Sequence, residues 1–149
     1  MLRRDYLLKL IQDLFSAITR VLIRDGGEIE KRRDVEALYT EFGANADFFR
    51  SASRADLIDQ VANWVANGTG VSPSEIPKDE MEQRLELLAL LLYADFKVSE
   101  LQFGLQCDVA RRSLALFLMV DASSDSYSID RRDKIIELRS FLGDGNDIL

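Results

Sequence analysis

The 149-residue sequence predicts an all-α protein of about six helices. In several long segments, apolar residues recur three and four positions apart, which is the spacing of one face of a helix. No stretch alternates apolar and polar residues for long, so the pattern of a half-buried strand is missing. Two prolines and eight glycines interrupt the chain, and the glycines stand mainly between the periodic segments.

Each expected helix combines a periodic apolar face with residues that start or stop a helix. The six helices are expected at residues 4–24, 28–42, 53–67, 77–98, 101–120 and 129–142. Gly43, Gly68 and Gly143 supply stops after the second, third and last helices, since glycine readily adopts the left-handed conformation at a helix end. Ser53, with Asp56 three residues later, predicts a cap at the start of the third helix.

The first expected helix has an unusually wide apolar stripe. Its members recur at three- and four-residue steps and are widened by neighbours: Leu7, Leu8, Ile11, Leu14, Phe15, Ile18, Val21 and Leu22. The stripe is wide enough for part of it to lie uncovered and pair with a second copy of the chain.

One segment, residues 68–76, has a composition that strongly breaks helices. It predicts a linker between an N-terminal three-helix part, 1–67, and a C-terminal part, 77–142. We expect a single domain over 1–149 in which the two parts are subdomains that share one core. Residues 44–53 contain two phenylalanines and are expected to add a short helical turn that fills the core.

Two segments, residues 87–94 and 114–120, are apolar on every side. A helix without a polar face must be covered from several directions, so the helix at 77–98 is expected at the centre of the fold. Both runs are shorter than the ~20 residues needed to span a bilayer. The tail, 144–149, is expected to fray.

Charge and composition exclude several classes of function. The chain has 26 acidic and 19 basic residues, a net charge of −7, so we expect neither nucleic acid nor an anionic membrane as its partner. It contains no histidine, which excludes Ser-His-Asp and Cys-His catalysis and metal sites built on imidazole. No cofactor is expected, and the chain is predicted not to be an enzyme.

The N-terminal segment and the single cysteine indicate a cytoplasmic protein. The first apolar stretch is broken by Lys9 and Asp13, and no cleavage site of small residues follows, so we expect no signal peptide. Cys107 has no second cysteine with which to form a disulfide, which fits a reducing compartment. A redox role is one interpretation of Cys107, and a small buried apolar residue in a helix is the favoured one.

Parts of the chain resemble an uncharacterised family of small all-helical bacterial proteins. The opening RDYLLKLI, residues 4–11, resembles the start of that family. The stretches at 87–93, 110–121 and 128–135 resemble its C-terminal helical hairpin, which looks like a tetratricopeptide repeat. No second copy occurs at the 34-residue period, so the resemblance implies one repeat-like hairpin and no activity.

Without histidine, acid–base or metal chemistry would depend on carboxylates and tyrosine. Candidates for a divalent-cation site lie near one face of the fourth helix: Glu75, Asp79, Glu82 and Glu86. Lys78 stands four residues before Glu82, however, which is typical of a solvated helix start. A carboxylate-dependent, metal-assisted enzyme is the first alternative function, with its site among Glu82, Glu86, Tyr93 and Asp95.

Basic residues gather at 31–33, 111–112 and 131–134, each group beside acids that favour ion pairs within a helix. Four arginines are the candidate partner-binding residues, able to hold an acidic peptide or a C-terminal carboxylate: Arg111, Arg112, Arg131 and Arg132. The second alternative, a nucleic-acid-binding regulator with a helix-turn-helix, is disfavoured because the following helix begins with acids. We predict a non-catalytic helical protein that binds another protein or itself.

Overall fold

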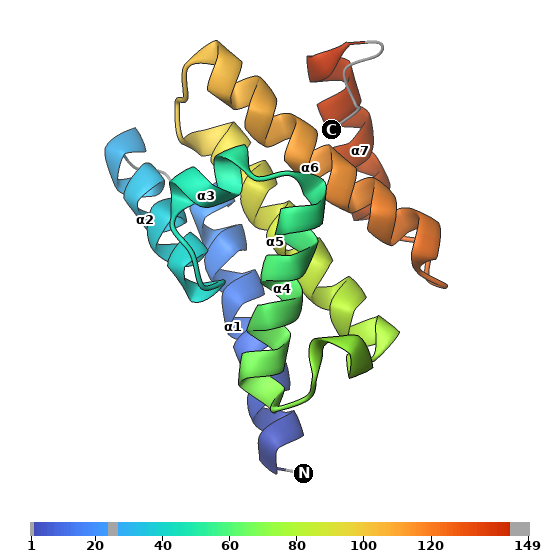
Figure 1. Ribbon diagram of the computed structural model, residues 1–149. Coiled ribbons are helices and arrows are strands. Elements are labelled where there is room, and N and C mark those ends of the chain that lie inside the picture. Colours follow the sequence, from blue (N-terminus) through green and yellow to red (C-terminus); the bar gives the residue numbers. More distant parts are fainter. Residues whose placement is uncertain (1, 24–26, 144–149) are drawn as a thin grey trace.

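The computed structural model describes residues 2–23 and 27–143, except for the side chains of residues 2–7, 28 and 29. Over these residues the chain forms seven α-helices and one 3-10 helix and contains no strand (Figure 1). The elements are α1 (Leu2–Ile23), α2 (Glu28–Glu41), α3 (Ala46–Ser51), α4 (Arg54–Thr69), η1 (Pro73–Glu75), α5 (Lys78–Val98), α6 (Phe103–Ser123) and α7 (Ile129–Leu142). The all-α prediction is confirmed.

One α-helix is additional to the six that the sequence predicts. This helix is α3, and it forms where the sequence predicts a short helical turn. The side chain of Asn45 caps it by accepting a hydrogen bond from the backbone N–H of Phe48 at 2.9 Å. Phe49 of this helix is fully buried and stacks on the ring of Tyr39, with 5.1 Å between ring centroids. The predicted cap of the next helix is also present, because Ser53 Oγ accepts from the N–H of Asp56 at 3.1 Å.

Two helix ends differ from the prediction. Helix α4 continues past Gly68 to Thr69, whose buried hydroxyl donates to the carbonyl of Val65 at 2.8 Å. Gly70, with a φ of +73°, supplies the left-handed residue that ends this helix. Helix α6 continues beyond residue 120, its predicted end, to Ser123. The expected fraying of 144–149 lies outside the described residues.

Helix α5 is at the centre of the molecule. Its residues 87–94 are all buried, as the apolar run predicts. Helices α1, α2, α4 and α6 pack against it, and the contact with α6 is the most extensive. Buried residues from both sides of the expected linker belong to one hydrophobic cluster. None of the described helices is long and apolar enough to cross a membrane.

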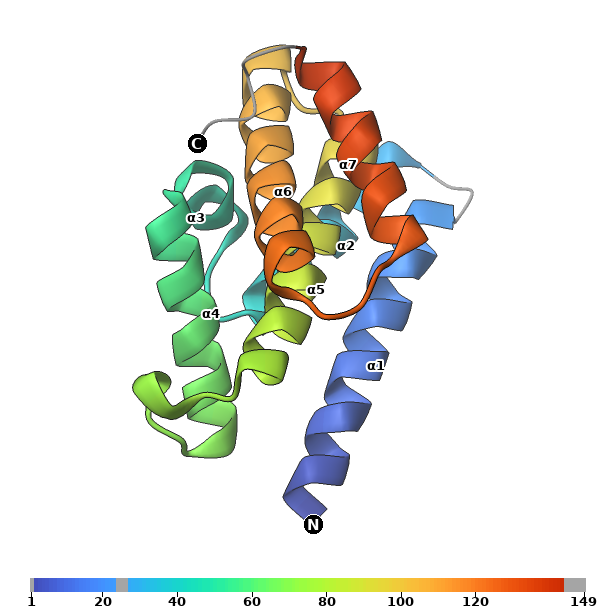
Figure 2. The same cartoon turned by 90° about the vertical axis from the view of Figure 1, so that its right-hand side faces the viewer.

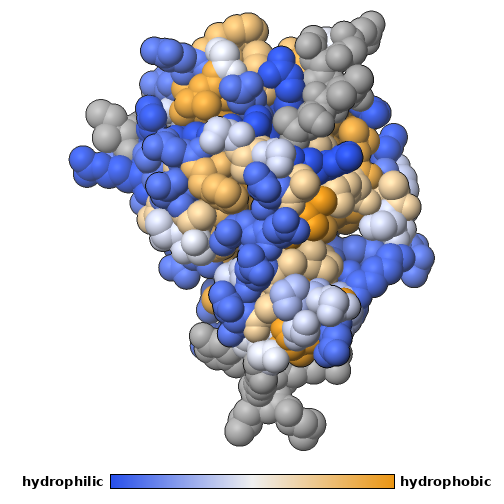
Figure 3. Space-filling view, viewed as in Figure 1, coloured by the Kyte–Doolittle hydropathy of each residue, from blue (hydrophilic) through white to orange (hydrophobic). Residues whose placement is uncertain are grey.

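The outer helices are arranged unevenly around α5. Helices α2, α3 and α4 cover one side, whereas α7 packs mainly on α6 (Figures 1 and 2). The N-terminal turns of α1 extend beyond the other helices (Figure 2). On the face shown in Figure 3, hydrophobic surface is divided into separate areas by hydrophilic side chains.

Candidate protein-binding groove

A groove of about 850 Å³ lies between α1, the first half of α5 and the N-terminal end of α7. Figure 2 shows how these three helices are placed. Its hydrophobic lining residues are Leu8, Ile11, Phe15, Leu22, Leu87, Leu90 and Phe117. Its polar and charged lining residues are Gln12, Ser16, Thr19, Gln83, Glu86, Ser128, Asp130, Arg131 and Lys134. A lining that combines apolar side chains with polar groups is typical of a binding site.

The wide apolar stripe of α1 explains why the groove is apolar. Leu14 and Ile18 are buried in the core, whereas Leu8 and Phe15 are 48% and 54% exposed. Residues seven positions apart on a helix differ by only about 20° in direction. Leu8, Phe15 and Leu22 therefore form one line beside the core-facing residues. A line of exposed large apolar residues, unlike a single one, indicates an interaction surface.

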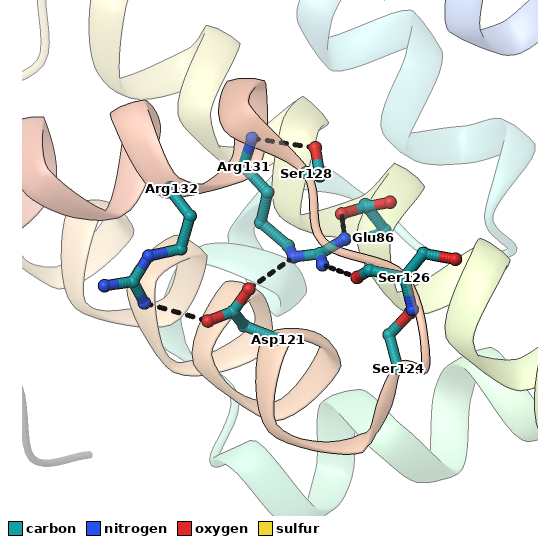
Figure 4. A network of polar contacts seen from close by, with 7 residues as sticks. All are labelled: Glu86, Asp121, Ser124, Ser126, Ser128, Arg131 and Arg132. Carbon is teal, nitrogen blue, oxygen red and sulfur yellow. Dashed lines mark hydrogen bonds and ion pairs between the residues drawn. The ribbon is translucent and has the colours of Figure 1, made fainter.

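The wall formed by α7 is fixed by the side chain of Arg131, which is buried (Figure 4). Its guanidinium donates to Asp121 of α6 at 3.0 Å and to Glu86 of α5 at 2.9 Å. A third hydrogen bond goes to the backbone carbonyl of Ser126 at 2.8 Å. Arg131 thus joins three helices and the loop before α7. The hydroxyl of Ser128 caps α7 by accepting from the N–H of Arg131 at 3.1 Å.

Asp121 is held in its charged form by two arginines. It accepts from Arg131 and, at 2.8 Å, from Arg132. The hydrogen bond from Arg131 and then that from Arg132 lower the pKa of Asp121, and partial burial opposes them only in part. Asp121 belongs to the last turn of α6.

The four predicted partner-binding arginines do not form one site. Arg131 and Arg132 meet at Asp121, but Arg112 is buried and donates to the backbone carbonyls of Ala52 at 2.7 Å and Ser51 at 2.9 Å. Arg111 pairs with Asp108 of its own helix. Nine residues separate Arg112 from Asp121, which places them on opposite sides of α6 at about 100° per residue. Arg112 therefore anchors the end of α3 at a distance from the groove.

The predicted carboxylate site does not converge either. Glu82 pairs with Lys78 along its own helix, whereas Glu86 binds Arg131. Asp95 faces α2 and α3, and Tyr93 faces α7. Among the described side chains, no three acidic or cysteine residues are grouped closely enough to hold a metal ion. Cys107 is half-buried and packs against the hydrophobic cluster.

Asp95 belongs to a buried triad, which we define as Tyr39, Arg50 and Asp95. Arg50 donates two hydrogen bonds to the Asp95 carboxylate, at 2.8 and 2.9 Å, and Tyr39 donates a third at 2.8 Å. Burial and then the charge of Asp95 raise the pKa of Tyr39 well above its usual range, so its hydroxyl remains a donor. Burial alone would lower the pKa of Arg50, but the bonds to Asp95 outweigh it and raise that pKa.

A second triad, which we call the surface triad because its two charged members are partly exposed, consists of the buried Tyr93 with Lys97 and Glu137. Glu137 of α7 accepts from Tyr93 at 2.5 Å and from Lys97 at 2.6 Å, both on α5. Burial alone would raise the pKa of Glu137, but the bonds from Lys97 and Tyr93 outweigh it and lower that pKa. Sequence reasoning missed both triads because the carboxylate of each lies far along the chain from its partners. Asp95 is 56 and 45 residues from Tyr39 and Arg50, and Glu137 is 44 and 40 residues from Tyr93 and Lys97.

Compared with known proteins, the chain matches no protein-family model, no curated protein and no solved structure. The resemblance to a family of small helical bacterial proteins and to a tetratricopeptide hairpin stays a prediction.

Proposed function

We propose that this chain is a non-catalytic protein-interaction module that binds an amphipathic helix of a protein partner in the groove beside α1. The observation that carries the proposal is the exposed line of Leu8 and Phe15 along an apolar groove. In this mode of recognition, one face of a helix places apolar residues into a hydrophobic groove.

The dimensions of the groove support a helical ligand. Its lining runs from Leu8 to Leu22 of α1, which is about 21 Å at 1.5 Å per residue. Residues at seven-position spacing form the line along which a second helix packs its own side chains. A ligand of four helical turns would therefore contact the whole groove.

The Arg131 network supports a preformed site. Because Arg131 ties the N-terminal end of α7 to Asp121 and Glu86, this wall keeps its position when no ligand is bound. Preorganised surfaces bind more tightly, since less conformational freedom is lost on association. Of the four predicted arginines, Arg131 thus contributes to the proposed function by positioning the wall, whereas the sequence pattern predicts direct contact of all four with a peptide.

A panel of synthetic amphipathic helical peptides, varied in charge and in apolar residues, tests the proposal. We expect at least one peptide to bind, with amide chemical-shift changes concentrated on α1, α5 and the start of α7. Phe15→Glu should weaken that binding at least tenfold. The matched control is Ile136→Glu on α7, because Ile136 is 60% exposed and lies outside the groove lining.

Two outcomes would contradict the proposed function. One is that the wild-type chain is monomeric and binds no peptide in the panel at millimolar concentration. The other is that Phe15→Glu and Ile136→Glu weaken binding equally. For the second outcome, circular dichroism verifies that both variants keep their helical content.

A further inference from the structure

We infer that the helix that occupies the groove is α1 of a second copy of this chain, packed antiparallel to the first around Phe15. This inference rests on the proposed function, because it names the partner of the same groove. It makes the molecule a homodimer in which each copy covers the exposed apolar line of the other.

The spacing along α1 is symmetric about Phe15. Leu8 lies seven residues before it and Leu22 seven residues after it, and all three line the groove. In an antiparallel pair centred on Phe15, each Leu8 faces Leu22 of the second copy, and the two Phe15 rings face each other. A two-fold interface requires such a self-complementary patch, since the same surface serves both copies.

The charges of α1 favour this pairing. The chain has a net charge of −7, so two copies repel each other wherever charged surfaces meet. None of the α1 residues that line the groove is charged. The charged residues of this stretch, Lys9, Asp13 and Arg20, are exposed outside the groove lining. Two α1 helices therefore meet without bringing like charges together.

The rest of the groove is also electrically balanced. Its charged lining residues are two acids, Glu86 and Asp130, and two bases, Arg131 and Lys134. Glu86 and Arg131 are already paired with each other at 2.9 Å. A strongly acidic or basic partner would gain little binding energy from such a surface, because electrostatic attraction requires a groove of the opposite net charge. A neutral, apolar helix face such as that of α1 fits it.

Sedimentation velocity over a range of protein concentrations tests the dimer. We expect the wild-type chain and Ile136→Glu to be dimers at micromolar concentration. Phe15→Glu should be a folded monomer, because two glutamates would then meet at the two-fold axis. Phe15 is 54% exposed, so circular dichroism and thermal unfolding should show a folded chain. A wild-type chain that stays monomeric at high micromolar concentration would overturn the inference.

Disulfide trapping in a Cys107→Ser background tests the antiparallel arrangement. Oxidised Phe15→Cys should form a covalent dimer, because the two-fold axis brings residue 15 within disulfide reach of its counterpart. Leu8→Cys alone should not, whereas a mixture of Leu8→Cys and Leu22→Cys should give the mixed dimer. Self-linking of Leu8→Cys as fast as that of Phe15→Cys would overturn the antiparallel arrangement.

The experiments distinguish failure of the dimer from failure of the helix-binding function. If the wild-type chain is monomeric but binds a panel peptide in a manner that depends on Phe15, the second-copy inference is wrong and the proposed function stands. If the chain is monomeric and no peptide binds, both are wrong. A dimer that Phe15→Glu does not dissociate would place the contact elsewhere and overturn the inference.

Discussion

The buried triad and the surface triad each combine a carboxylate, a tyrosine and a cation, but they lie at different depths in the molecule. In each, a carboxylate accepts from a tyrosine and a cation, and the cation lies 5.9 Å from the ring centre of that tyrosine. Asp95 of the buried triad is 0% exposed, whereas Glu137 of the surface triad is 38% exposed. The comparison teaches that depth, more than chemistry, decides how strongly a fold depends on an ion pair.

The two triads also join different parts of the molecule. The buried triad links α2 and α3 to the central helix. The surface triad links α7 to the same helix, and the N-terminal end of α7 borders the groove. We expect the region around the buried triad to determine global stability and the region around the groove to tolerate substitution.

Between the two triads, the largest difference in the free energy of unfolding is expected when the carboxylate of each is removed. Asp95→Ala should lower the free energy of unfolding by about 3–5 kcal/mol, because it leaves the Arg50 guanidinium buried and unpaired. Glu137→Ala should lower it by about 1 kcal/mol or less, since water replaces the lost partner. Urea denaturation of the two variants and the wild type measures both values.

A double variant serves as the control for this prediction. Arg50→Met combined with Asp95→Leu should be more stable than Asp95→Ala alone, because no charge then remains uncompensated in the core. A double variant less stable than Asp95→Ala would contradict the proposed physical cause.

An intermediate difference is expected from the two tyrosine hydroxyls. Tyr39→Phe should cost about 1–3 kcal/mol, because a buried carboxylate then loses a hydrogen-bond donor that no water replaces. Tyr93→Phe should cost about 1 kcal/mol or less, because Glu137 remains in contact with Lys97 and solvent. Thermal unfolding of both variants in one buffer measures the two costs. Equal shifts in Tm would contradict the expected difference between them.

The smallest expected effect is the pH dependence contributed by Glu137. Its pKa in the folded chain is lowered, so its stabilising bonds are fully present above the ordinary value of about 4.3. They are lost as the pH falls through the lowered folded pKa, when the carboxyl becomes protonated. Glu137→Gln should therefore have a flatter stability profile than the wild type below about pH 5. Parallel profiles would argue against this contribution.

Much of the fold followed from local patterns. The apolar run at 87–94 predicts a helix covered on all sides, and α5 is that helix. Ser53 predicts a cap that is present, because capping depends on residues only three positions apart. Gly68, in contrast, is not a helix stop, since Thr69 packs into the core and Gly70 adopts the left-handed conformation instead.

The candidate site was predicted only in part. The wide stripe of α1 indicates an uncovered apolar face, and Leu8 and Phe15 are indeed exposed. The other walls of the groove come from residues of α5 and α7 that are more than sixty positions from the α1 lining residues in the sequence. No local sequence pattern predicts that these helices lie beside α1. The same limit explains Arg131, whose neighbours in sequence do not reveal that Glu86 binds it.

The sequence by itself determined the helical periodicity, the helix that must lie at the centre, and the absence of imidazole chemistry. These properties depend on composition and on residues within a few turns of each other. The tertiary structure alone decided which charged groups were buried. Asp95 and Glu137 look alike in the sequence, and packing places one among apolar side chains and the other at the surface, where water screens its charge.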